Sequence, residues 1–106
     1  RLFVNPKRKG SAGERELCMW LTAHGYPARR NEQRYIGGKG NPDVVAEGLE
    51  RFHLEVKRME RLNIHAAMRQ AERDADGRIP AVVHRRNRAP WLITMHLEDW
   101  IKGQSP

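Results

Sequence analysis

The sequence predicts an α/β fold in which helices flank a mixed β-sheet, with the elements in the order αβββαββα. Short stretches rich in β-branched and aromatic residues alternate with stretches whose apolar residues recur at helical spacing. Two short stretches, 44–46 and 52–57, are close enough in sequence to form a hairpin. A helical stretch then separates them from the next strand, and such a crossover makes the sheet mixed. Because 106 residues suffice for one core, we expect a single domain over 1–106.

The first part of the chain combines a basic segment, a helix and a strand. Residues 1–10 are expected to form a basic arm. A helix is expected over 11–24, where apolar residues fall on one stripe and Gly25 can follow as a left-handed end residue. A strand is expected over 26–30. Residues 31–41 hold three glycines without the pattern of a nucleotide-binding loop, and we expect a substrate-facing loop there.

The remaining elements follow from periodicity and from turn residues. Ile64, Ala67 and Met68 begin an apolar helical stripe, and Asp76-Gly77 ends it. Pro80 leads into the next apolar strand. The expected elements are the hairpin strands 44–46 and 52–57, a helix over 63–74, strands 81–84 and 91–95, and a closing helix over 97–102.

The hairpin carries the residues that point to a chemistry. Side chains alternate along a strand, so Glu55 and Lys57 share one face while Leu54 and Val56 share the other. Asp43 stands at the head of the preceding strand and brings a second carboxylate beside them. Carboxylate oxygens bind Mg²⁺, and a nearby cation can stabilise the charge that develops during phosphodiester hydrolysis. The combination predicts a nuclease metal site.

Each of these residues also has a simpler interpretation. A Glu-x-Lys pair commonly lines the solvated face of an edge strand, and Asp43 after Asn-Pro can serve to start a turn. The placement of both acids on adjacent strands of one hairpin favours the metal site.

Charge supports a nucleic-acid partner. The chain has 20 Lys and Arg against 13 Asp and Glu, and 15 of the basic residues are Arg, which binds phosphate through two parallel hydrogen bonds. No apolar run is long enough to span a membrane, so DNA is favoured over a membrane surface. The basic residues cluster at Lys7-Arg8-Lys9, at Arg29-Arg30 with Arg34, and at Arg85-Arg86 with Arg88.

The cysteine and histidine residues argue against an intrachain disulfide and against a structural zinc site. Cys18 is the single cysteine, so an intrachain disulfide is impossible and an intracellular location is expected. The five histidines lack the spacing of zinc ligands, so no structural zinc is expected.

Several segments of the chain together form a recognisable pattern. They are residues 8–17 (Arg-Lys-Gly-Ser-Ala-Gly-Glu-Arg-Glu-Leu), His24-Gly25-Tyr26 with Arg30, Pro42-Asp43 and Glu55-Val56-Lys57. This combination resembles the archaeal-type Holliday junction resolvases. The resemblance extends from about Lys7 to Trp100. These resolvases belong to the PD-(D/E)XK nucleases, whose restriction-endonuclease-like fold matches the element order expected here.

The resemblance implies a catalytic set, a cofactor and partners. Glu14, Asp43, Glu55 and Lys57 would be catalytic, with Glu14 reaching the site from the first helix. Mg²⁺, or Mn²⁺ as a substitute, would be held by Asp43, Glu55, the Val56 carbonyl and Glu14. The substrate would be DNA, a four-way junction, and the enzyme a homodimer that makes paired nicks. The expected DNA-binding residues are Lys7, Arg8, Lys9, Arg15, Arg29, Arg30, Arg34 and Lys39.

Some assignments stay open at the level of sequence. Glu14 also fits a capping box with Ser11, and Glu16 is a second available carboxylate. Gln70 is expected to be a solvated helix residue rather than a site residue, and His53 fits a solvated strand position. The loop over 31–41 and the residues after Lys57 depart from the family pattern, which leaves the substrate preference open. Apolar candidates for a dimer surface are Ile64, Met68, Trp91 and Trp100.

Two other functions compete with junction resolution. One is a PD-(D/E)XK nuclease that acts on other branched, nicked or duplex DNA. The other is a nucleic-acid-binding protein that keeps the fold without activity, although the four intact acidic and basic positions argue against it.

Overall fold

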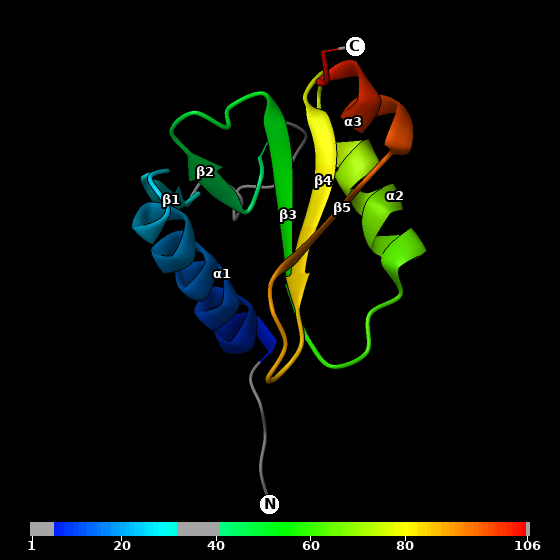
Figure 1. Ribbon diagram of the computed structural model, residues 1–106. Helices are drawn as coiled ribbons and strands as arrows, with labels where there is room; N and C mark the ends of the chain where they lie inside the picture. Colours follow the sequence, from blue (N-terminus) through cyan, green and yellow to red (C-terminus); the bar gives the residue numbers. More distant parts are fainter. Residues whose placement is uncertain (1–5, 32–40, 106) are drawn as a thin grey trace, which may run out of the picture.

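The computed structural model describes residues 6–31 and 41–105, and it has the expected order of elements (Figure 1). Within these residues the elements are α1 (Pro6–Ala23), β1 (Ala28–Arg30), β2 (Val44–Ala46), β3 (Phe52–Arg58), α2 (Ile64–Asp74), β4 (Ile79–Arg85), β5 (Leu92–Met95) and α3 (Leu97–Lys102). The order αβββαββα is therefore confirmed.

The five strands form one mixed sheet in the order β1-β2-β3-β4-β5. Each neighbouring pair is antiparallel except β3 and β4, which run parallel in register from Phe52↔Ile79 to Arg58↔Arg85. The chain passes from β3 to β4 through α2, as parallel neighbours require. The predicted crossover helix is thus the element that makes the sheet mixed.

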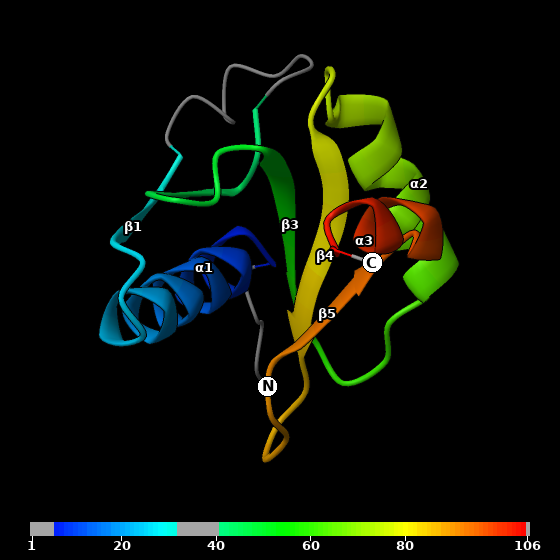
Figure 2. The same ribbon diagram turned by 45° about the horizontal axis from the view of Figure 1, so that its top comes forward.

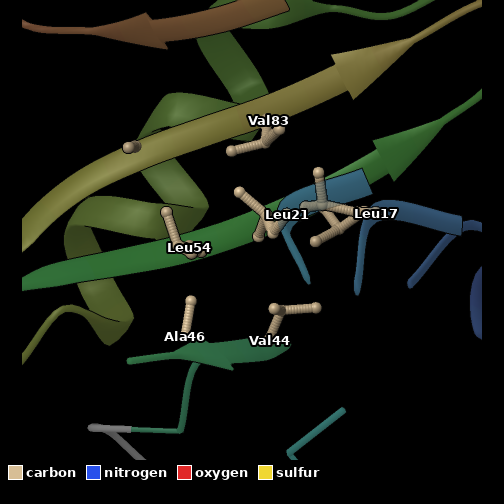
Figure 3. Close-up of a cluster of buried hydrophobic side chains, with 8 residues drawn as sticks. Leu17, Leu21, Val44, Ala46, Leu54 and Val83 are labelled. Atoms are coloured by element: carbon tan, nitrogen blue, oxygen red, sulfur yellow. The ribbon is translucent and has the colours of Figure 1, made fainter. Parts of the chain in front are cut away.

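Helices cover the two faces of the central strands. Figures 1 and 2 show α1 and α2 on opposite sides of β3 and β4. Neighbouring residues of β4 point to opposite faces of the sheet. Val83 packs in the core under α1, and Val82 packs in the core under α2. The α1 core, shown in part in Figure 3, contains Leu17, Leu21, Val44, Ala46, Leu54, Val56, Ala81 and Val83. The α2 core contains Ala67, Met68, Ala71 and Val82.

The helix ends follow the local chemistry of the chain. Gly25 has φ of +94° after α1, and the adjoining Tyr26 N–H donates to the Leu21 carbonyl at 2.9 Å, so the predicted glycine end of α1 is present. At the start of α2, the Asn63 side chain accepts a hydrogen bond from the Ala66 N–H at 3.0 Å. At the end of α1 and at the start of α2, flanking residues therefore form hydrogen bonds with backbone groups of the terminal turn.

The first helix begins earlier than expected, so residues 6–10 of the expected basic arm are helical. Helix α1 begins at Pro6, five residues before Ser11, and proline is well tolerated in the first turn of a helix. Residues 1–5 lie outside the described part. The first strand is also shorter than expected, and β4 is longer because Pro80 lies within it, opposite His53 in the parallel register.

Most of the candidate dimer residues pack in or against the two hydrophobic cores. Met68 of α2 is buried in the α2 core. Ile64 packs against the same core and Trp91 against the α1 core, whereas Trp100 is about half exposed. None of the helices in the described ranges is both long enough and apolar enough to cross a membrane.

Candidate active site

Asp43 is fixed where the edge of β2 meets β3. Its backbone N–H donates to the Leu54 carbonyl at 3.0 Å, and its own carbonyl accepts from the Asn31 N–H at 3.0 Å. Its side-chain Oδ2 accepts from the Val56 N–H at 2.9 Å. The first carboxylate therefore lies directly against the strand that carries Glu55, as the hairpin predicts.

Burial and the nearby Glu55 disfavour the charged form of Asp43. Burial raises the pKa of Asp43 to about 7, and the negative charge of Glu55 adds to this effect. The Val56 N–H opposes the shift, while the charge of Glu14 and a hydrogen bond with Glu55 support it. Two buried carboxylates that repel each other in this way would be stabilised by a divalent cation between them.

Lys57 completes the group on β3. The Glu55 side chain is almost fully buried, and its Oε2 lies 4.0 Å from Lys57 Nζ. Lys57 Nζ donates to Gln70 Oε1 on α2 at 3.0 Å. The expectation of a solvated Gln70 is therefore wrong, because α2 packs close enough to β3 for this side chain to hold the lysine.

His53 also differs from its expected solvated position. The residue is fully buried, and its Nε2 lies 3.2 Å from Glu55 Oε1. The alternation of the strand places His53 and Glu55 on one face, but sequence does not show that a helix covers that face. Here α2 covers it.

Glu14 is buried on α1 and is paired with Arg30. Arg30 Nε donates to Glu14 Oε1 at 3.1 Å, and Arg30 Nη2 donates to Ser11 Oγ at 2.9 Å. Because α1 begins at Pro6, Ser11 is inside the helix and the capping-box interpretation is wrong. The negative charge of Glu14 is one of the smaller causes of the raised pKa of Asp43, and a catalytic role for Glu14 stays a prediction.

Glu16, the other carboxylate of α1, has a structural role. It forms ion pairs with Arg58 at 3.2 Å and with Arg85, at the ends of β3 and β4. This bridge anchors the helix that carries Glu14 to the strand that carries Glu55 and Lys57. Asn31 is a further residue that the sequence did not reveal. It is buried, and its Nδ2 donates to the Pro42 carbonyl at 2.8 Å, which helps to fix the approach to Asp43.

The donor set fits a hard divalent cation. Within residues 6–31 and 41–105, no three His, Cys, Asp or Glu side chains form a ready-made metal cluster. Two adjacent buried carboxylates, Asp43 and Glu55, are nevertheless present, and the Val56 carbonyl follows in the chain. Carboxylate and carbonyl oxygens are the ligands that Mg²⁺ uses, with water completing the coordination.

The expected DNA-binding residues occupy different environments. Arg15 on α1 and Arg29 on β1 are exposed, whereas Arg30 is partly buried against Glu14. Lys7, Arg8 and Lys9 lie in the first turns of α1. Arg34 and Lys39 lie outside the described residues. The role of these residues stays a prediction.

Comparison with solved structures supports the fold. The chain is similar to Hjc, a Holliday junction resolvase from the archaeal hyperthermophile Archaeoglobus fulgidus, with a TM-score of 0.55 and 24% sequence identity. The match covers 77% of this chain and 72% of the resolvase chain. No protein-family model and no curated protein sequence matches the chain. The expected restriction-endonuclease-like α/β fold is thus confirmed.

Proposed function

We propose that the protein is a Mg²⁺-dependent, structure-selective DNA endonuclease that resolves four-way junctions by paired nicks. The observation that carries the proposal is the convergence of Asp43 and Glu55 at the β2–β3 junction, with Lys57 beside them. The similarity in fold to a Holliday junction resolvase supports the choice of substrate.

Asp43, Glu55 and the Val56 carbonyl would hold Mg²⁺ or Mn²⁺, and Glu14 would add negative charge from α1. When bound, such a cation lowers the pKa of a water molecule and offsets the negative charge of the phosphate. In the protein itself, the Val56 N–H donates to Asp43 Oδ2, and His53 Nε2 lies 3.2 Å from Glu55 Oε1.

Lys57 would orient the attacking water and stabilise the pentacovalent phosphate. Its ammonium group lies near Glu55 and is held by Gln70 at 3.0 Å, so the positive charge is already oriented beside the carboxylates. Because Lys57 is only partly exposed, bulk water competes less for hydrogen bonds with its ammonium group. The exposed arginines, together with the formal net charge of +7, would attract the DNA backbone.

A cleavage panel tests the proposal. The substrates are a four-way junction with a mobile core, a flap, a nicked duplex and a linear duplex of equal length, each with Mg²⁺. We expect the junction to be cut fastest by the wild-type protein. We also expect Asp43→Asn and Glu55→Gln to lose cleavage while they still bind the junction in Ca²⁺, whose looser coordination does not position a water as Mg²⁺ does.

Each other outcome of the panel points to a different function. Equal cutting of all substrates would leave a general nuclease of the same fold. Cutting that persists in Asp43→Asn would exclude the metal site. Binding without any cleavage in Mg²⁺ or Mn²⁺ would indicate a non-catalytic DNA-binding protein.

A further inference from the structure

His53 is buried in an incompletely satisfied environment. It lies in the middle of the sheet on β3, and its side chain is fully buried. Its Nε2 contacts Glu55 Oε1 at 3.2 Å, whereas its Nδ1 has no hydrogen-bond partner among the described residues. Buried ring nitrogens normally have partners, so this arrangement needs a reason.

The contact with Glu55 determines which nitrogen carries the proton. A Glu55 carboxylate that holds a cation can only accept hydrogen bonds, so His53 Nε2 must donate to it. In the neutral imidazole, Nδ1 is then a bare acceptor, and leaving such a group buried without a donor is unfavourable. An apolar side chain at position 53 would remove this buried acceptor but would leave Glu55 Oε1 without its donor, so the contact with Glu55 is what explains the histidine.

The two oxygens of Glu55 have different neighbours. Oε1 faces His53, and Oε2 lies 4.0 Å from Lys57 Nζ. A hydrogen bond to one oxygen fixes the rotation of the carboxylate and leaves the other oxygen oriented toward the reacting groups. Groups that orient ligating carboxylates in this way typically contribute about 10–100-fold to metal affinity or activity.

We propose that His53 is a positioning residue that fixes the Glu55 carboxylate for cation binding through its Nε2–H. The inference rests on the proposed function, because it requires Glu55 to be a ligand. In this role the buried His53 would touch neither DNA nor the cation.

Two substitutions of similar shape separate this role from simple packing. In His53→Gln, the side-chain amide can place an N–H group near the position of Nε2. In His53→Met, a side chain of the same length fills the space without a donor. Mn²⁺ binding to each intact protein, followed by the electron paramagnetic resonance signal of free Mn²⁺, measures the metal site without reference to activity.

We expect His53→Met to bind Mn²⁺ about tenfold or more weakly than the wild type and to cut the junction correspondingly more slowly at saturating DNA. Junction binding in Ca²⁺ should stay unchanged. His53→Gln should retain most of both properties. Urea unfolding in EDTA should show that His53→Met is folded, because removal of the unpartnered Nδ1 partly offsets the lost donor to Glu55.

If His53→Met does not fold, His53→Asn replaces it, because the shorter amide cannot reach Glu55 and should show the same loss relative to His53→Gln. Equal Mn²⁺ affinities and equal rates in the wild type and in the donor-lacking variant would overturn the inference while leaving the proposed function intact. A wild-type protein that binds no Mn²⁺ and cuts no DNA would instead overturn the proposed function.

Discussion

Asp43 shows how the surroundings of a single residue link function to stability. Its carboxyl group is buried and faces Glu55, which raises its pKa to about 7 from an ordinary value near 4. Between about pH 4 and pH 7 the folded protein therefore holds a proton on this group that the unfolded chain has released. The contribution of Asp43 to the free energy of unfolding falls across this interval as the pH rises, and its penalty is complete above the folded-state pKa.

We therefore predict that Asp43→Asn stabilises the metal-free protein at pH 8, by about 2 kcal/mol in the free energy of unfolding, and has much less effect at pH 5. The neutral amide avoids repulsion by Glu55, and its oxygen can still accept from the Val56 N–H. Urea unfolding in EDTA at the two pH values measures the difference. Added Mg²⁺ should stabilise the wild type but not the variant. A gain of the same size at both pH values would contradict the account.

Lys57 provides a second prediction at this scale. Lys57→Met should lower the rate of junction cleavage by about 100-fold or more, because a preorganised positive charge near the reacting phosphate is lost. Binding in Ca²⁺ should change little. Lys102→Met, on α3, is the matched control, since that lysine is well exposed and pairs with Glu98. Similar losses in both variants would remove Lys57 from the reaction.

The sequence predicted the residues whose positions depend on local structure. Strand alternation and the short hairpin sufficed to bring Asp43 near Glu55 and Lys57. The partners of these residues come from tertiary packing instead. Gln70 contacts Lys57 because α2 covers that face of β3, and Arg30 pairs with Glu14 because β1 runs beside α1. Neither contact leaves a periodic signal in the sequence.

At the scale of elements, α1 must approach β3 closely to bring Glu14 to the site. Gly13 allows this approach, since a Cβ atom there would lie 2.6 Å from the Cβ of Arg58. The neighbouring Glu16 then bridges Arg58 and Arg85. A glycine inside a helix is therefore explained by packing against a strand.

Gly13→Ala should destabilise the protein by roughly 1–3 kcal/mol, although alanine is the better helix former, because the added methyl group forces α1 away from β3. Gly103→Ala is the control, because its Cβ would make only an ordinary contact at 3.5 Å. Thermal unfolding of both variants gives the comparison. A more stable Gly13→Ala protein would show that helix propensity outweighs the contact and that the packing can relax.

Element types were predictable and several boundaries were not. Apolar periodicity identifies each helix and strand, but the sequence alone favours a start of α1 at Ser11, since serine is a common capping residue. In the structure, Ser11 accepts a hydrogen bond from Arg30 inside the helix. The Ser11 hydroxyl, which the sequence suggests would cap the helix, instead accepts a hydrogen bond from the Arg30 side chain of β1.

At the scale of the whole molecule, one chain provides one candidate site, whereas symmetric resolution of a junction requires two cuts. A two-fold homodimer would supply both sites. Exposed apolar side chains are available in two places, with Trp20, Leu92 and Ile93 near α1 and β5, and Leu97, Trp100 and Ile101 on α3. Sedimentation of the wild type at micromolar concentration should show a dimer, and a monomer would remove the basis for paired nicks.

Cleavage of a supercoiled plasmid that extrudes a cruciform tests the central proposal most directly. Two nicks made in one encounter at the four-way junction convert the plasmid to a linear product, whereas independent single nicks give an open circle. We expect the wild type with Mg²⁺ to give mainly linear product, and Glu55→Gln to give neither product. Open circles alone, or equal cutting of a plasmid without the cruciform, would contradict junction resolution by paired sites.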